Sequence, residues 1–136
     1  MNSRTLDSKL YLAAVTVILL HLLTAAFYIM DSVEKNDGKT PYSVTVKDVP
    51  VDAFWSITVY NADGYLEKND LGRNSFNNSS AKPNEDGSYT IHFGGDPESI
   101  NYLPITEGWN YAVRMYQPRK EIIEGEWTFP SIEPVK

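Results

Sequence analysis

Arg114 is the residue of this sequence whose type and position could most directly bind a ligand. In its apolar segment, strict alternation places Arg114 on one face together with Ala112 and Tyr116. A guanidinium on a strand can hold the carboxylate of a ligand through two parallel hydrogen bonds. The competing interpretation is a structural ion pair with a carboxylate of the same chain, such as Asp63 or Glu107, because a half-buried charge usually has a fixed partner.

Four aromatic residues could complete a binding site around this arginine. Trp55, Tyr60, Trp109 and Tyr116 could form a platform on which the ring of a sugar stacks. Aromatic residues on sandwich strands more often fill the core, so the same four residues also have a packing interpretation. With Arg114 they make up the predicted ligand-binding set, for a small molecule or a glycan.

Catalytic, metal and cofactor sites have no comparable pattern. The chain contains no cysteine, which excludes thiol nucleophiles, disulfides and thiolate metal sites. The carboxylate pairs Asp63 with Glu67 and Glu107 with Glu124 could hydrolyse a glycosidic bond if their carboxyl groups lay about 5–10 Å apart. His92 is the one histidine of the exported part, and a single histidine cannot make a typical zinc site without carboxylates. We expect no catalytic residues, no metal and no cofactor, with a carbohydrate-active enzyme as an alternative.

The uncharged apolar run from Leu10 to Met30 predicts the cellular location of these residues. Its 21 residues are long enough, at about 1.5 Å each, to cross a bilayer core as one helix. We therefore expect a transmembrane helix or uncleaved signal anchor. The rival interpretation is a cleaved signal peptide, with Thr24-Ala25-Ala26 as the cleavage site. Basic Arg4 and Lys9 precede the run, so the remainder is exported.

These features predict four regions and a location. Residues 1–9 form a cytoplasmic tail, 10–30 the membrane span, 31–40 a linker and 41–136 a β-sandwich domain. The protein would sit in the inner membrane as a single-pass protein with its domain in the periplasm, or be free in the periplasm if the signal is cleaved. Residues 31–136 hold 10 of the 12 basic and 17 of the 18 acidic residues. This negative balance disfavours nucleic acids and anionic lipid surfaces as partners.

Short alternating segments separated by Gly, Pro and Asn predict the fold of the exported part. This spacing, without a second long helix, is typical of an all-β, antiparallel, jelly-roll-like sandwich. Within the strongest segment, Trp55, Ile57 and Val59 share one face, whereas Tyr60 lies on the other. The predicted strands are Tyr42–Val46, Ala53–Asn61, Arg73–Asn77, Ser88–Phe93, Trp109–Gln117 and Glu126–Phe129, with one helical turn over Pro118–Gly125.

Two segments carry a family signature. They are DGKTPYSVTVKDVPVDAFWSITVYNADGYLEKNDLGRNSFNN, and YTIHFGG followed by LPITEGWNYAVRMYQPRKEIIEGEWTFP. Together they resemble the family called domain of unknown function 1214, over roughly Glu34 to Val135. The resemblance implies a jelly-roll-like module of an exported bacterial envelope protein, with no established activity. Such modules usually follow a larger domain, domain of unknown function 1254, and here the apolar run stands before the module instead.

The sequence therefore favours a membrane-anchored envelope module that binds a protein, a small molecule or a glycan without catalysis. Two alternatives remain open. The chain could be a truncated remnant of a longer two-domain exported protein, or a carbohydrate-active enzyme that uses carboxylates near Arg114.

Overall fold

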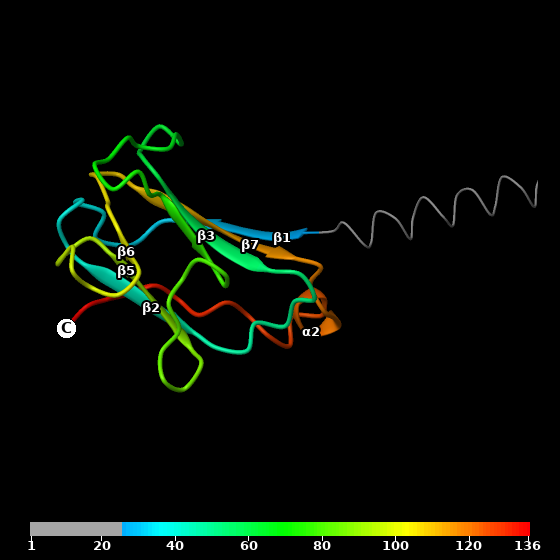
Figure 1. The fold of residues 1–136 in the computed structure, drawn as a ribbon. Coiled ribbons are helices and arrows are strands. Elements are labelled where there is room, and N and C mark those ends of the chain that lie inside the picture. The colour runs from blue at the N-terminus through cyan, green and yellow to red at the C-terminus, as the bar shows by residue number, and fades with distance from the viewer. Residues whose placement is uncertain (1–25) are drawn as a thin grey trace, which may run out of the picture.

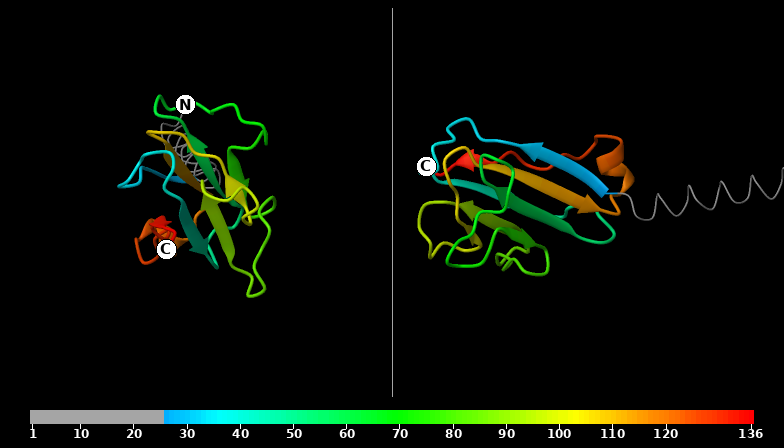
Figure 2. Two further views of the ribbon diagram at one scale, coloured as in Figure 1. Left: turned by 90° about the vertical axis from the view of Figure 1, so that its left-hand side faces the viewer. Right: turned by 90° about the horizontal axis from the view of Figure 1, so that it is seen from above.

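The computed structural model describes residues 26–136, which fold into two stacked β-sheets (Figure 1). Sheet A contains, in spatial order, β1 (Ala26–Asp31), β7 (Asn110–Tyr116), β3 (Trp55–Tyr60) and β4 (Ser75–Asn77). Sheet B contains β6 (Tyr102–Leu103), β5 (Tyr89–Phe93), β2 (Tyr42–Val46) and β8 (Glu133–Pro134). The end-on view in Figure 2 shows the two sheets as separate layers. The prediction of an all-β fold is confirmed.

Strand direction departs from the prediction at one edge. All neighbouring strands are antiparallel except β5 and β6, which run parallel. The expectation of an entirely antiparallel sandwich is therefore wrong at this edge. The β6 strand has only two residues, too few to show an alternating pattern in the sequence.

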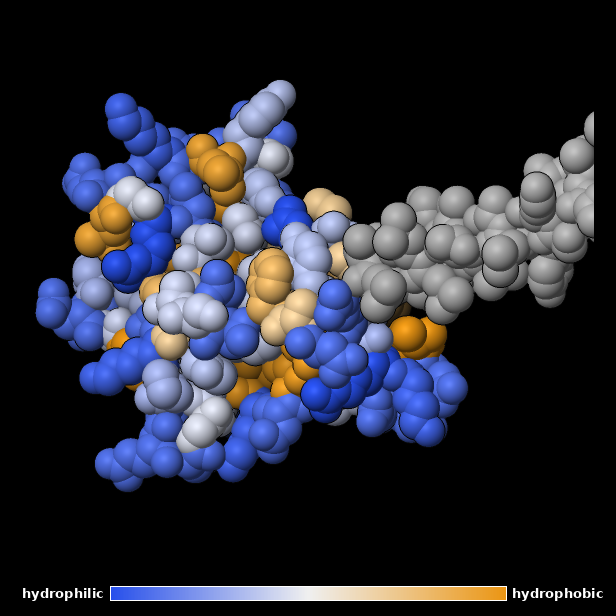
Figure 3. All heavy atoms as spheres, turned by 45° about the vertical axis from the view of Figure 1, so that its right-hand side comes forward, coloured by the Kyte–Doolittle hydropathy of each residue, from blue (hydrophilic) through white to orange (hydrophobic). Residues whose placement is uncertain are grey.

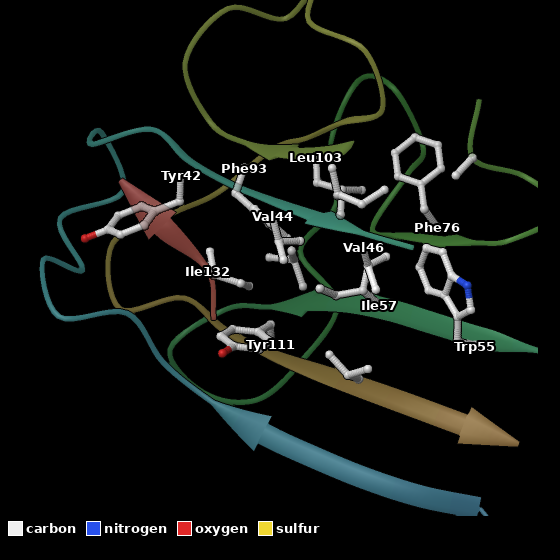
Figure 4. Close-up of a cluster of buried hydrophobic side chains, with 14 of the residues drawn as sticks. Tyr42, Val44, Val46, Trp55, Ile57, Phe76, Phe93, Leu103, Tyr111 and Ile132 are labelled. Carbon is white, nitrogen blue, oxygen red and sulfur yellow. The ribbon is translucent and has the colours of Figure 1, made fainter. Parts of the chain in front are cut away.

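The core lies between the two sheets, as Figure 4 shows. Ile57 and Val113 come from sheet A and Ile91 and Phe93 from sheet B, and all four side chains are fully buried. Alternation explains this, because every second residue of β3 and β7 is apolar and points towards sheet B. Each such side chain contributes about 1.5–3 kcal/mol on burial, so the facing rows hold the layers together.

The first strand is the largest difference from the sequence prediction. Residues 26–30 were expected in the membrane span, yet Ala26–Asp31 forms the edge strand β1 and pairs with β7 along its whole length. Ile29 opposite Val113 packs against the core. The sandwich therefore includes residues that were expected to precede it, from Ala26 onwards. Apolar composition does not distinguish a continuing helix from an apolar strand that follows it.

The rest of the predicted span, residues 10–25, and the predicted tail, residues 1–9, lie outside the described residues. Among residues 26–136, no helix is both long enough and apolar enough to cross a membrane.

The predicted linker is a packed loop. Val33 is buried, and the Asn36 amide donates a hydrogen bond to the backbone carbonyl of Trp109. The backbone N–H groups of Lys39 and Thr40 donate to the Asp37 carboxylate. These contacts fix the segment on the end of the sandwich where β7 begins.

The C-terminal part follows the prediction in one element and departs from it in another. The predicted helical turn is the short helix α2 (Lys120–Ile123), at the end of the sandwich where β1 begins (Figure 1). The predicted strand over Glu126–Phe129 is absent from the described structure. Phe129 packs against Trp55 instead, and the last strand is β8.

Candidate functional site

The candidate site is the outer face of sheet A, the side turned away from the core. The strand register assigns twelve strand positions to this face, and Arg114 is the one charged residue among them. The face is therefore almost neutral, although the whole chain has a net charge of −6. The twelve residues are Ala26, Tyr28, Met30, Ser56, Thr58, Tyr60, Ser75, Asn77, Asn110, Ala112, Arg114 and Tyr116.

Tyrosine and threonine side chains hold the guanidinium of Arg114. One terminal nitrogen donates a hydrogen bond to Thr58 Oγ1 at 3.3 Å, and the other donates to Tyr60 Oη at 2.7 Å. The guanidinium carbon lies 5.8 Å from the ring centroid of Tyr28 and 5.9 Å from that of Tyr60. Within residues 26–136, the ion pairs of the sandwich do not include Arg114, so it has no carboxylate partner there. The structural ion pair considered from the sequence is not formed.

Arg114 keeps its charge and retains hydrogen-bonding capacity. The hydrogen bond to Tyr60 raises the pKa of Arg114, and partial burial opposes that increase. A guanidinium has five N–H donors, and two of them are used here. The described residues therefore leave three of its donors unused.

Two of the predicted aromatic residues share this face with Arg114. Tyr60 accepts the hydrogen bond described above, and Tyr116 stacks on Phe54 with ring centroids 4.3 Å apart. Alternation along β7 was sufficient to place Tyr116 on the side of Arg114, whereas Tyr60 joins them through the pairing of β3 with β7.

The other two predicted aromatic residues, Trp55 and Trp109, lie in the core. Trp55 is 3% exposed and contacts Tyr89 edge-on, and Trp109 is fully buried and stacks on Phe93. Their assignment as ligand-binding residues is therefore wrong. For Trp55 the sequence already carried the signal, because alternation separates it from Tyr60.

Sequence reasoning missed a row of residues that crosses all four strands of sheet A. In the register, Tyr28 is opposite Arg114, Arg114 is opposite Ser56, and Ser56 is opposite Asn77. Tyr28 was missed because its segment was assigned to the membrane span. Ser56 Oγ and Asn77 Nδ2 have no hydrogen-bond partner among the described residues. No motif marks these two side chains, since only the strand pairing brings them beside Arg114.

The site is an open surface. The hollow next to it, between Tyr60, Asn69, Asn74 and Pro104, has a volume of about 100 Å³. Cavities that enclose a small molecule usually measure about 300–1,000 Å³. A ligand of the outer face would therefore lie across the strands rather than inside a pocket. On the side of the molecule drawn in Figure 3, blue hydrophilic side chains predominate and the orange apolar atoms form separate small patches.

One of the two candidate carboxylate pairs is too widely separated for glycoside hydrolysis. Asp63 and Glu67 are exposed on the loop after β3, where Glu67 accepts a hydrogen bond from Asn61. Glu107 precedes β7 and Glu124 follows it, and the seven residues of that strand separate its ends by about 20 Å. This exceeds the separation of about 5–10 Å at which two carboxyl groups can flank a glycosidic bond.

Two other carboxylates have perturbed protonation, in the direction opposite to a general acid. Hydrogen bonds from the backbone of Thr40 and Lys39 hold the pKa of Asp37 well below its usual range. A hydrogen bond from the Ser88 hydroxyl lowers the pKa of Asp86. Both groups stay ionised and order their loops.

His92 has a local structural partner. Its Nδ1 lies 2.7 Å from the backbone carbonyl of Ile100, which orients the imidazole on the loop between β5 and β6. Within the described part of the chain, no three residues of the metal-binding types His, Cys, Asp and Glu gather closely enough to hold an ion.

Fold and face together define the class of protein: a small β-sandwich whose open sheet carries a single cation among neutral polar and aromatic side chains. Residues 25–120 match the family described as "Protein of unknown function (DUF1214)", and the chain belongs to this family. The resemblance predicted from the sequence is thereby confirmed for this domain. No curated protein matches the chain.

A solved structure shares the fold. The crystal structure of the VPA0106 protein from Vibrio parahaemolyticus matches with a TM-score of 0.72 and 30% sequence identity. The match covers 84% of this chain and 31% of the Vibrio chain. The present chain thus spans about a third of that protein's length.

Proposed function

We propose that this protein is a non-catalytic binding module of the bacterial envelope, and that the outer face of sheet A is its binding face. The observation that carries the proposal is the environment of Arg114. Its guanidinium is held in place by Thr58 and Tyr60 and has no carboxylate partner within residues 26–136, so an anion from outside the sandwich can pair with it. On this face a ligand is the natural source of that anion, because no acidic side chain occupies any of the twelve positions.

The same residues support binding over catalysis. The outer face carries no Asp, Glu, His or Lys in its strand positions, so it lacks the usual general acids and bases. The Tyr60 hydroxyl is engaged by Arg114 at 2.7 Å. What the face offers is hydrogen-bond donors and aromatic rings, which recognise and orient a ligand.

The proposed location is the periplasmic side of the inner membrane, with the apolar run as the anchor. Because β1 begins at Ala26, sixteen residues of the run remain before the fold, near the lower limit of about 17 for a spanning helix. Cleavage beside Ala26 is the competing form, and it would keep Tyr28 and the other outer-face residues that follow Ala26. The mass of the protein in membrane and periplasmic fractions distinguishes the two forms.

The binding face is tested by NMR on full-length protein that carries fluorinated tyrosine. The chain has nine tyrosines, and three of them, Tyr28, Tyr60 and Tyr116, lie on the outer face. On addition of a small-molecule extract of the periplasm, we expect shifts confined to these three signals and abolished by Arg114→Gln. Shifts at other tyrosines only, or shifts that persist in Arg114→Gln, would argue against the proposed face.

A second candidate is docking of a companion domain of the kind called domain of unknown function 1254. It is favoured by the match to only 31% of the longer Vibrio chain and by the exposure of Tyr28 (55%) and Met30 (73%) on the same face. In this version the chain is a remnant that needs its partner. Thermal unfolding with light scattering separates the two candidates. A monodisperse protein with one cooperative transition supports the self-contained module, and aggregation on mild heating supports the remnant.

A further inference from the structure

The row that crosses sheet A beside Arg114 has the dimensions and chemistry of a small extended site. It runs Tyr28, Arg114, Ser56, Asn77, one residue from each strand. Neighbouring strands lie about 4.8 Å apart, so the row is about 14 Å long. An aromatic ring stands at one end, a cation beside it, and a free hydroxyl and a free amide nitrogen on the other side.

The cation selects the charge of the ligand. Three free N–H donors in the planar guanidinium match the two oxygens of a carboxylate. Arg114 is the one charged residue of the face, so a singly charged group is neutralised there and a doubly charged phosphate is not. A polyanion would also meet the negative field of a chain with net charge −6, whereas one carboxylate needs only the short-range contact with Arg114.

The neighbours of the cation select the rest of the ligand. Tyr28 is 55% exposed, and its ring lies 5.8 Å from the guanidinium, so a flat apolar surface is free beside the carboxylate position. Ser56 and Asn77 offer polar groups without partners among the described residues. A saccharide has both an apolar ring face for stacking on an aromatic side chain and hydroxyl groups for such partners.

From this row we infer that the ligand is a sugar acid, a saccharide that carries one carboxylate per ring. Its carboxylate binds Arg114, its ring stacks on Tyr28, and its hydroxyls, or those of a linked second sugar, reach Ser56 and Asn77. This inference rests on the binding face proposed above and names the chemical class of its ligand.

The test compares four probes against the full-length protein in detergent micelles, by calorimetry and by fluorotyrosine NMR. Glucuronate carries ring and carboxylate, glucose the ring alone, acetate the carboxylate alone, and inorganic phosphate a different anion. We expect glucuronate to bind about tenfold more tightly than each of the other three, with a shift of the Tyr28 signal.

Variants assign the contacts to residues. Arg114→Gln should weaken glucuronate binding by about tenfold or more, and Tyr28→Thr by about threefold to tenfold. Arg114→Lys keeps the charge but lacks the planar guanidinium that makes two parallel hydrogen bonds, so we expect an intermediate loss of glucuronate affinity. This variant provides the test if Arg114→Gln misfolds. The matched control is Arg119→Gln, because Arg119 pairs with Asp52 outside the outer face.

Each adverse outcome has a distinct meaning. Equal affinity for glucose and glucuronate overturns the carboxylate contact, equal affinity for acetate overturns the ring contact, and a preference for phosphate overturns the sugar acid. A concentration-dependent shift of Tyr28 without any probe means that a second copy covers the face, which also overturns the inference. If non-acidic periplasmic compounds shift the three outer-face tyrosines, the proposed binding face stands and only the sugar acid falls. If nothing shifts them, both fall.

Discussion

Replacing Trp109 by alanine tests the division between core and binding face. Trp109 is fully buried and stacks on Phe93 at 5.3 Å between centroids, and Tyr42 lies edge-on at 6.1 Å. Removal of a buried tryptophan costs about 3–5 kcal/mol. The indole N–H has no hydrogen-bond partner among the described residues, so losing it offsets part of this cost. We therefore expect a loss of about 3 kcal/mol.

That loss is large for a domain of this size. Domains typically have about 5–15 kcal/mol of stability, and 1 kcal/mol shifts the Tm of a domain of about 100 residues by at least about 4 °C. Trp109→Ala should therefore lower Tm by about 12 °C or more. Thermal unfolding of the full-length protein, followed by near-ultraviolet circular dichroism, measures it.

Tyr116→Ala is the matched control, an aromatic residue of the same strand region on the outer face. Tyr116 is half-buried and its ring contact is with Phe54, itself 40% exposed, so the expected loss is about 1 kcal/mol. If Trp109→Ala unfolds at the wild-type temperature, or if Tyr116→Ala is equally damaging, our assignment of the two faces is refuted.

Three further perturbations probe the packed loop and the first strand. Gly38→Ala should lower Tm more than Gly64→Ala. Both glycines have a positive φ, but only at Gly38 would an added Cβ clash with backbone atoms of another segment. An equal decrease in Tm for both variants would contradict this. Asp37→Ala should lower Tm at pH 7. The difference in Tm between the wild type and this variant should become smaller as the pH falls below 3.8, because a carboxylate with a lowered pKa stabilises the fold only while it is ionised. A difference in Tm that does not change with pH would exclude this cause. Ile29→Asp should abolish the protection of residues 26–31 against amide hydrogen exchange, whereas Met30→Asp, on the exposed side, should not change this protection. Equal protection in both variants would show that core packing does not hold β1.

Alternation made the centre of sheet A predictable. Ile57 and Val113 sit in segments whose apolar residues recur at every second position, and the same pattern brought Arg114 and Tyr116 to one side. Local sequence was sufficient there because one face of each strand is buried.

The first strand could not be found in the same way. No glycine, proline or charge interrupts the sequence from Ala25 to Met30, so nothing local marks the point at which the apolar run gives way to β1. Pairing with β7, whose partner residues lie about 80 to 90 positions further along the chain, is what defines it. The place of Tyr28 beside Arg114 depends on that pairing, so the local sequence could not reveal it.

The attachment of β1 has a mechanical consequence. The chain before Ala26 joins the fold through an edge strand whose six residues all pair with β7. The hydrogen bonds between β1 and β7 are perpendicular to the strands. A force along β1 from its first residue therefore shears all of these hydrogen bonds at the same time, instead of breaking them one after another. A force between the segment before Ala26 and a ligand held by β3 and β7 would therefore be resisted by all the hydrogen bonds between β1 and β7. If these bonds broke, β1 would detach together with Tyr28, and the ligand would lose that contact at the same moment.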